Sequence, residues 1–169
     1  MKLYIFYLRQ DDPKKCTAIK LFKFKLIKLI TNPKLIPKFA VTLNPYAKEV
    51  LTPTDKELIE RNGLIAIDCS WNKIYETFKK RFKGLNKRLP FLLAANPINY
   101  GKLSKLSSAE ALASALYIVG YKKEAEKILS LFKWGKTFLT LNKNPLKDYS
   151  KAKSMEEVLK LEKEYFEGF

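Results

Sequence analysis

The fold of this chain is decided by residues 62–71, which read Asn-Gly-Leu-Ile-Ala-Ile-Asp-Cys-Ser-Trp. The Asn-Gly pair is a helix stop, and the continuous apolar run after it is typical of a strand that is covered on both faces. The sequence therefore predicts a buried strand of a parallel sheet. Asp68 and Trp71 follow that strand directly, at the edge of such sheets where ligands bind.

The residues before this strand alternate between strand and helix patterns. Residues 2–8 and 38–43 are predicted strands, and residues 17–30 have apolar positions at helical spacing with Lys between them. Thr54 and Glu57 have the spacing of a capping box, which predicts a helix that ends at the Asn-Gly pair. This alternation predicts a parallel sheet with right-handed crossovers.

The second half of the chain has a different pattern. A basic helix is predicted over 72–82, and an apolar piece and a turn-rich stretch then extend to residue 101. We expect the α/β class: a small, mostly parallel sheet with helices, followed by an all-helical C-terminal domain. The expected domains are 1–88 and 89–169, with a ligand site between them. Helices are predicted at 108–118, 122–132, 136–142 and 155–166.

Charge is the strongest feature of the composition. Lys and Arg number 33 against 17 acids, which gives a formal net charge of +16. This excess favours a polyanionic partner, with nucleic acid ahead of a membrane surface. Because only four of the 33 are Arg, a general Lys bias is the alternative explanation. No apolar run approaches the roughly 20 residues of a membrane span, and the opening apolar stretch is too short for a signal peptide, so we expect a cytoplasmic protein.

Missing residue types exclude several kinds of chemistry. The chain has no His, which excludes Ser-His-Asp and Cys-His catalysis and His-bound metals. Its two Cys, Cys16 and Cys69, cannot form a four-Cys zinc site, and we predict no metal. Any reaction must use carboxylates, hydroxyls, backbone groups or a cofactor.

Several motifs, in matching order, give the chain a family resemblance from residue 1 to about residue 150. Together they resemble the 18S/16S rRNA aminocarboxypropyltransferase family of archaea and eukaryotes. The motifs are Asp-Pro-Lys-Lys-Cys-Thr (12–17), Asp-Cys-Ser-Trp (68–71), Arg-Leu-Pro (88–90), Ala-Ala-Asn-Pro-Ile-Asn-Tyr-Gly (94–101), Leu-Ser-Ser-Ala-Glu-Ala (106–111), Leu-Tyr-Ile-Val-Gly (116–120) and Phe-Lys-Trp-Gly (132–135).

The resemblance implies a reaction and a fold. The 3-amino-3-carboxypropyl group of S-adenosylmethionine would be placed on N3 of a modified uridine in a small-subunit rRNA hairpin loop, with release of methylthioadenosine. The fold would be SPOUT-like, with a trefoil knot, and the protein a monomer that acts on rRNA or a pre-ribosomal particle. Two alternatives stay open: a SPOUT-type RNA methyltransferase, and a non-enzymatic assembly factor that binds rRNA.

The resemblance also implies a set of cofactor-binding residues. Leu43, Pro45, Leu89, Leu106 and Ala111 would enclose the adenine, the backbone of Ile67 would meet the ribose, and Thr17 and Ser108 would hold the amino-acid end, with Ser104 nearby. Glu110 lies in the first turn of a predicted helix, where a negative charge is favourable, and is assigned a structural role.

Asp68 and Trp71 have a physical reason to join this site. A sulfonium is a permanent cation, which an indole face or a carboxylate attracts at short range. We predict that Trp71 contacts the cofactor on its methyl side and that Asp68 acts as a base or as a charge stabiliser. The alternative is that Asp68 or Ser70 caps the following helix and Trp71 is part of the core.

The basic residues on either side of this site form the predicted RNA surface. They would hold the RNA backbone, while an unpaired loop base supplies selectivity. The alternative for each Lys is an ordinary solvated side chain. The predicted RNA-binding residues are Lys20, Lys23, Lys73, Lys79, Lys80, Arg81, Lys83, Lys87 and Arg88.

Overall fold

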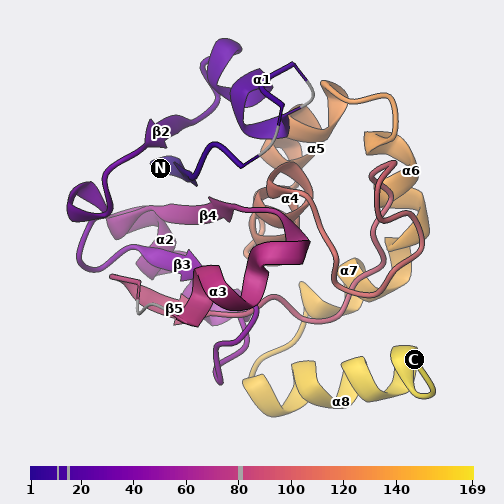
Figure 1. Ribbon diagram of the computed structural model, residues 1–169. Helices are drawn as coiled ribbons and strands as arrows, with labels where there is room; N and C mark the ends of the chain where they lie inside the picture. The colour runs from indigo at the N-terminus through magenta and orange to yellow at the C-terminus, as the bar shows by residue number, and fades with distance from the viewer. Residues whose placement is uncertain (11, 15, 80–81) are drawn as a thin grey trace.

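Five parallel strands form one sheet in the computed structural model, which describes residues 1–10, 12–14, 16–79 and 82–169 (Figure 1). Their order across the sheet is β2-β1-β4-β3-β5, and every adjacent pair is parallel. The predicted buried strand is therefore the central one, β4, and the expectation of a parallel sheet is confirmed. The strands are β1 (Leu3–Tyr7), β2 (Lys28–Ile30), β3 (Val41–Leu43), β4 (Leu64–Asp68) and β5 (Leu85–Lys87).

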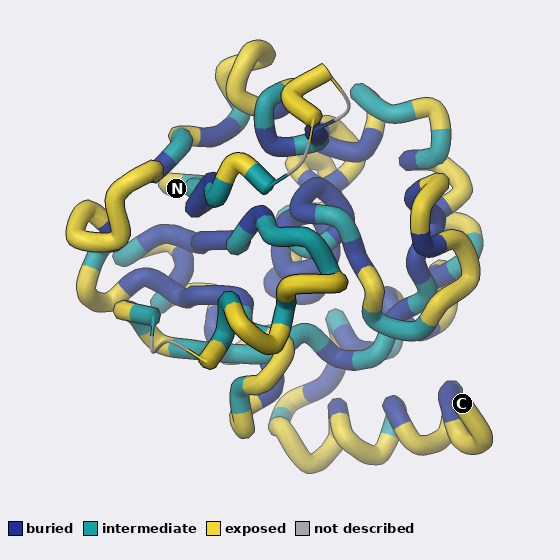
Figure 2. Tube along the Cα trace, viewed as in Figure 1, coloured by how far each residue is buried: buried dark blue, intermediate teal, exposed yellow. Residues whose placement is uncertain are grey.

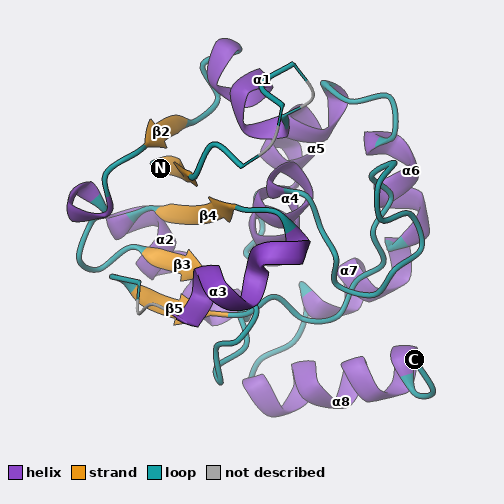
Figure 3. Ribbon diagram, in the orientation of Figure 1, coloured by secondary structure: helices purple, strands orange, loops and turns teal. Residues whose placement is uncertain are grey.

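Helices connect the strands and form most of the chain after β5 (Figure 3). In Figure 1, α3 lies in front of the sheet, and α4 to α7 lie beyond the carboxyl ends of the strands. The last helix, α8, lies at the bottom of the view, below α7. Among the helices of the described residues, none is long and apolar enough to span a lipid bilayer. The α-helices are α1 (Thr17–Lys23), α2 (Lys56–Asn62), α3 (Ile74–Lys79), α4 (Ser108–Ile118), α5 (Lys122–Ser130), α6 (Gly135–Leu141), α7 (Lys143–Tyr149) and α8 (Met155–Phe166), and the short 3₁₀ helices are η1 (Pro33–Leu35), η2 (Pro53–Asp55) and η3 (Trp71–Lys73).

Both faces of the sheet are covered, as the continuous apolar run of β4 predicts. Alternate side chains of a strand point to opposite faces. Ile5, Tyr7 and Ala66 join the larger core cluster, whereas Phe6 and Ile65 join a smaller one on the other face. The larger cluster also takes buried residues from α1, α2, α4, α5, α6, α7 and α8, so one core extends from the sheet to the C-terminal helix (Figure 2).

The predicted helix over 17–30 is wrong in its second half. Lys25 has a φ of 58°, the left-handed conformation that usually ends a helix at Gly. Leu26 N–H donates to Leu21 O and Lys25 N–H to Phe22 O, the two hydrogen bonds of a Schellman motif. The chain then turns, and the last three residues of the predicted helix, 28–30, form β2 beside β1.

The starts of α1, α4, α5 and α8 agree with the sequence, whereas α7 was not predicted and one capping box differs. The box before α2 pairs Thr52 with Asp55, in η2, rather than Thr54 with Glu57. The helix predicted over 72–82 is divided into η3 and α3, and residues 80–81 of that prediction lie outside the described part of the chain. Gly63 ends α2 as predicted: its φ is 92°, and a Cβ there would lie 2.9 Å from Lys2 O.

Candidate functional site

A cavity of about 580 Å³ lies at the carboxyl ends of β3 and β4. Most of its lining comes from four parts of the chain: residues 16–17 at the start of α1, residues 43–45 at the end of β3, the 66–74 stretch at the end of β4, and the wall segment. We use the name wall segment for residues 88–108, which join β5 to α4. Asp12, Phe78, Ala111 and Trp134 complete the lining. This is the position at which ligands bind in open parallel sheets.

Asp68 joins three elements at the base of this cavity. It is the last residue of β4 and only 6% exposed. Ser108 Oγ donates to Asp68 Oδ1 at 2.7 Å, and Cys16 Sγ donates to Asp68 Oδ2 at 3.4 Å. Burial, followed by the nearby Asp68 charge, raises the pKa of the Cys16 thiol to about 11. The thiol therefore stays protonated at neutral pH and can keep donating to the carboxylate.

Trp71 is a half-buried side chain that lines the cavity. Its Nε1–H donates to Leu106 O at 3.1 Å, which ties η3 to the wall segment and fixes the indole. Ser70 precedes η3 but makes no side-chain capping hydrogen bond, while its own N–H donates to Gln10 Oε1 at 2.8 Å. The alternative in which Ser70 caps this helix is thus not supported, and Trp71 borders open space instead of filling the core.

Glu110 in α4 holds the middle of the wall segment. The residue is fully buried, and its two oxygens accept four hydrogen bonds. Oε1 accepts from the N–H groups of Ala95 and Asn96 at 2.7 and 3.0 Å, and Oε2 accepts from Asn96 Nδ2 and Ser107 N–H at 2.8 and 2.7 Å. The predicted structural role of Glu110 therefore extends beyond its helix, because this carboxylate shapes a cavity wall.

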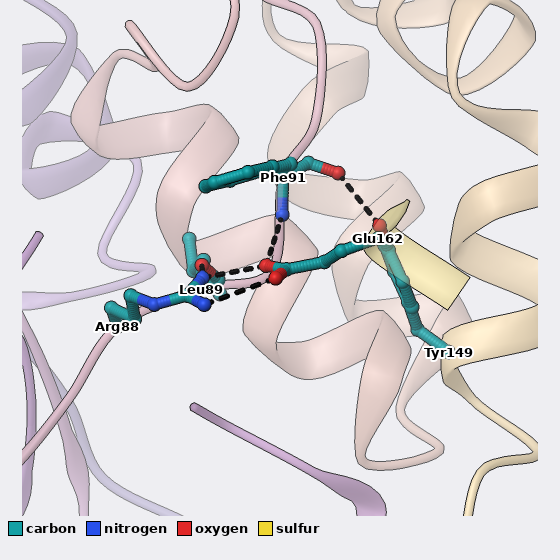
Figure 4. A network of polar contacts seen from close by, with 5 residues as sticks. All are labelled: Arg88, Leu89, Phe91, Tyr149 and Glu162. Atoms are coloured by element: carbon teal, nitrogen blue, oxygen red, sulfur yellow. Dashed lines mark hydrogen bonds and ion pairs between the residues drawn. The ribbon is translucent and has the colours of Figure 1, made fainter. Parts of the chain in front are cut away.

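Glu162 in α8 holds the start of the wall segment (Figure 4). Its carboxylate forms a two-pronged ion pair with Arg88, with N–O distances of 2.6 and 3.0 Å, and accepts from Phe91 N–H at 3.0 Å. Tyr149 OH in α7 donates to Phe91 O at 3.0 Å. Farther along, Asn142 exchanges hydrogen bonds with both backbone groups of Leu93. Side chains of helices thus provide the partners that a sheet would give to this irregular backbone.

Ser104, in the same segment, has an unusual conformation. Its φ is 58°, which is uncommon for a residue other than Gly. The residue lines the cavity, and its Oγ is the one buried side-chain polar atom of the described residues for which no hydrogen-bond partner is found. Buried hydroxyls normally have a partner, so an orphaned one in a cavity wall points to a ligand.

The sequence is similar over almost its whole length to proteins of one family. It is 47% identical to the 16S rRNA aminocarboxypropyltransferase of Methanococcoides burtonii, over 96% of this chain and 94% of that protein. It is also 47% identical to the protein of the same name from Methanocaldococcus jannaschii, over 97% and 95% of the two chains. The chain belongs to the 16S rRNA aminocarboxypropyltransferase family.

A solved structure and two family models extend this result. The structure of the SAM-dependent rRNA:acp-transferase Tsr3 from Vulcanisaeta distributa matches with a TM-score of 0.88 and 42% identity, over 95% of this chain and 88% of that one. A family model described as "Ribosome biogenesis protein, C-terminal" matches residues 41–166. A model described as a possible Fer4-like domain in RNase L inhibitor matches residues 1–35. That stretch holds one Cys, whereas an iron–sulfur cluster takes four ligands.

All the cofactor residues predicted for this aminocarboxypropyltransferase family member lie around the one cavity. Asp68, the predicted base or charge stabiliser, lines it as well. The structure therefore brings together residues that are up to 94 positions apart in the sequence, while their binding roles stay predictions. The lining includes Thr17, Leu43, Pro45, Ile67, Trp71, Leu89, Ser104, Leu106, Ser108 and Ala111.

The predicted RNA-binding cations divide into three groups. Five are exposed in the structure: Lys20, Lys23, Lys73, Lys79 and Lys83. Lys80 and Arg81 lie outside the described residues, and Lys87 and Arg88 are paired with acids.

Lys87 and Arg88 were predicted to bind RNA, but their side chains do not extend freely into solvent. Lys87 Nζ lies 2.6 Å from Glu49 Oε2 and 3.3 Å from Asp55 Oδ1, and its side chain is only 16% exposed. The Arg88 side chain is 19% exposed and paired with Glu162. Both positive charges are paired with acids of the protein, so the proposed RNA surface does not include Lys87 and Arg88.

The sequence analysis missed the side chains that hold the wall segment. Asn142 and Glu162 lie 49 and 71 positions from the backbone groups that they bind, so no local pattern pairs them. The sequence did contain one signal for Glu162. Val158, Glu162 and Phe166 form the buried stripe of α8, so an acid occupies a position where an apolar residue is expected.

Proposed function

We propose that this protein uses S-adenosylmethionine to transfer a 3-amino-3-carboxypropyl group to N3 of a uridine, or N1-methylpseudouridine, in small-subunit rRNA during ribosome biogenesis. The observation that carries the proposal is the single cavity at the ends of β3 and β4, which all ten predicted cofactor residues and Asp68 line. When bound, S-adenosylmethionine supplies a sulfonium whose neighbouring carbon is open to attack by the RNA base.

The lining fits this cofactor in three ways. Leu43, Pro45 and Leu89 offer an apolar wall for an adenine, together with Leu106 and Ala111. Asp68 and Trp71 offer a carboxylate and an indole to a cation. The orphaned Ser104 Oγ lacks a polar partner that a ligand can supply. Thr17 and Ser108 would hold the amino-acid end, and the backbone of Ile67 the ribose.

For Asp68, the structure favours charge stabilisation over proton abstraction. A base for uridine N3 must contact the RNA, whereas this carboxylate is 6% exposed and lies beneath Ser108 and Cys16. Asp68→Asn keeps the shape and removes the charge. We expect the cofactor affinity to fall about tenfold or more, with turnover at saturating cofactor changed much less. A large loss of turnover with unchanged affinity would instead assign the base.

Trp71 is proposed to decide which carbon reacts. Its indole is fixed by the hydrogen bond to Leu106 O, so it forms a rigid part of the wall. We propose that this wall covers the methyl side of the sulfonium, so that the longer arm faces the RNA and proximity selects it. Trp71→Ala is then expected to add methyl transfer as a side reaction. The product mass shows the difference, because the two transfers add about 101 and 14 Da to the RNA by atom counting.

The proposed RNA surface consists of Lys20, Lys23, Lys73, Lys79 and Lys83. These cations would bind the phosphates of an rRNA hairpin loop, free or within a pre-ribosomal particle in the cytoplasm, and the protein would act as a monomer. Because phosphate binding releases counterions, the RNA affinity should fall steeply with added salt. A flat salt dependence would remove this surface from the proposal.

We also propose that the fold is SPOUT-like and contains a trefoil knot, with an α/β domain to residue 88 and a helical domain from residue 89. The position of the strands before residue 88 and of α4 to α8 after it supports this division, although both halves share one core. Stretching the protein by its termini tests the knot. A tightened knot leaves the extended chain shorter than the roughly 3.3–3.6 Å per residue of a free chain.

The deciding experiment combines the purified protein, S-adenosylmethionine and small-subunit rRNA. Titration calorimetry should detect cofactor binding, and mass spectrometry of RNA digests should find a uridine-type nucleoside heavier by one aminocarboxypropyl group. An RNA heavier by a methyl group would make the protein a methyltransferase. Absence of cofactor binding would make it an RNA-binding assembly factor.

A further inference from the structure

Five aromatic rings form a row from the smaller core cluster to the protein surface. We call this set, Phe6, Phe82, Phe78, Tyr46 and Tyr75, the aromatic row. Successive ring centroids lie 5.9, 5.4, 6.2 and 6.5 Å apart, and the contacts are edge-on or tilted. Phe6 is buried in β1, so the outer rings are anchored on the sheet.

The outer end of the aromatic row consists of two tyrosines that packing does not hide. Tyr46 is 57% exposed and Tyr75 is 65% exposed, although large rings are usually well covered. Tyr46 N–H also donates to Asn44 Oδ1 at 2.9 Å, which fixes the turn after β3. The two rings are thus exposed and positioned at the same time, a combination typical of a binding surface.

This pair is next to residues that line the cavity. Tyr46 directly follows Pro45, and Tyr75 directly follows Ile74; both Pro45 and Ile74 line the cavity, as does Phe78. Because Tyr46 also packs against Phe78, a group that rests on the two tyrosines lies close to the cavity wall.

The surroundings indicate an unpaired nucleotide as the occupant. Lys73 is exposed directly before α3, Lys79 is exposed at its end, and Lys48 is exposed two residues after Tyr46. Two acids, Glu49 and Glu76, are exposed in the same stretches, and Glu49 is paired with Lys87, so cations still predominate. Cations beside exposed rings are the usual composition of single-strand binding sites, because every base can stack and every phosphate is an anion.

We propose that Tyr46 and Tyr75 form a stacking platform for an unpaired base that flanks the modified base of the RNA. This inference rests on the proposed function and extends it to the choice of substrate. The N3 atom of uridine lies on the edge that pairs in a duplex, so the target base must leave its stack before it can enter the cavity. The platform gives the neighbouring base a new stacking partner at that moment and favours loops over duplexes.

The test compares two RNA probes of equal length, a hairpin with a uridine-containing loop and a fully paired duplex. Tyr46→Ala and Tyr75→Ala should each weaken hairpin binding by about 5- to 150-fold, as expected when one base loses an aromatic partner, with little change for the duplex. Tyr→Phe at either position should keep the wild-type affinity, and Tyr→Leu should not. The slope of log affinity against log salt should stay unchanged in the tyrosine variants but decrease in Lys79→Gln.

Phe169→Ala is the matched control, because this C-terminal ring is 73% exposed and does not line the cavity. It should leave hairpin binding unchanged. Wild-type hairpin affinity in both alanine variants, or an equal loss for hairpin and duplex, would overturn the platform. Cofactor binding, measured in parallel by calorimetry, separates the two proposals. If the wild-type protein does not bind S-adenosylmethionine, the proposed function fails, while the hairpin and duplex affinities still decide on the platform.

Discussion

Glu110→Gln should be one of the most damaging isosteric changes in this protein. The four groups that approach the carboxylate are all donors: the N–H groups of Ala95, Asn96 and Ser107, and Asn96 Nδ2. A glutamine amide has one oxygen and one NH₂ group. Whichever way it is turned, its NH₂ group meets two donors. Asn96 cannot simply flip in response, because its Nδ2 also donates to Lys105 O at 3.1 Å and its Oδ1 accepts from Asn99 N–H at 3.1 Å.

The size of the effect follows from this count. Two hydrogen bonds to a charged group are lost at about 1.5–3 kcal/mol each, so we expect the free energy of unfolding to fall by about 3–5 kcal/mol after some relaxation. For a chain of this length, that corresponds to a melting temperature about 10 °C lower. Because Asn96 and Ser107 line the cavity, the affinity for S-adenosylmethionine should fall as well.

Urea unfolding followed by circular dichroism measures the stability, and calorimetry measures cofactor binding. Glu157→Gln is the matched control, since this exposed acid also lies near a helix start and its Oε2 accepts from Lys153 N–H at 2.7 Å. It should cost no more than about 0.5 kcal/mol. The reasoning is refuted if Glu110→Gln is within about 0.5 kcal/mol of the wild-type protein, because four converging donors would then not require a carboxylate.

Three further changes test other parts of the structure. Glu162→Ala leaves the Arg88 guanidinium without its partner and should lower the free energy of unfolding by about 3 kcal/mol and weaken cofactor binding, whereas a loss below about 1 kcal/mol in urea unfolding would contradict the role of this pair. Burial and the Asp68 charge raise the pKa of Cys16 to about 11, so its alkylation by iodoacetamide in the native protein should accelerate about tenfold per pH unit between pH 8 and 10. Peptide mass spectrometry measures the alkylation rate at Cys16, and a rate that levels off below pH 9 would show that the thiol ionises normally. Gly135→Ala places a Cβ 1.9 Å from Leu129 O and should destabilise the protein by about 2–3 kcal/mol, with exposed Thr140→Ala, measured in the same thermal scans, as the control that stays near wild type.

Sequence reasoning succeeded where the structural signal is local. The apolar run of β4 and the capping box of Ser107 and Glu110 are each complete within a few residues, and both elements are where we predicted them. It failed where tertiary contacts decide. Lys25 adopts a left-handed conformation usually taken by Gly, and β2 and β5 contain three residues each, so their pairing depends on neighbouring strands.

The cavity was predictable only in part, for the same reason. Asp68 and Trp71 could be placed from the end of the central strand, and the other lining residues from the family resemblance. The anchors of the wall segment could not, because Asn142, Tyr149 and Glu162 bind backbone groups far away in the sequence. A sequence shows that a polar residue occupies a position in an apolar stripe, but it does not show which distant backbone group that residue binds.

The dependence of the wall segment on α7 and α8 has a consequence for biosynthesis. All five strands are encoded before residue 88, so the sheet can begin to assemble while the chain is still being made, at about 5–20 residues per second. Glu162, however, lies 74 residues after Arg88 in the chain, and without it Arg88 and Phe91 lack their partner. A nascent chain should therefore acquire the ability to bind a ligand only after α8 has emerged from the ribosome.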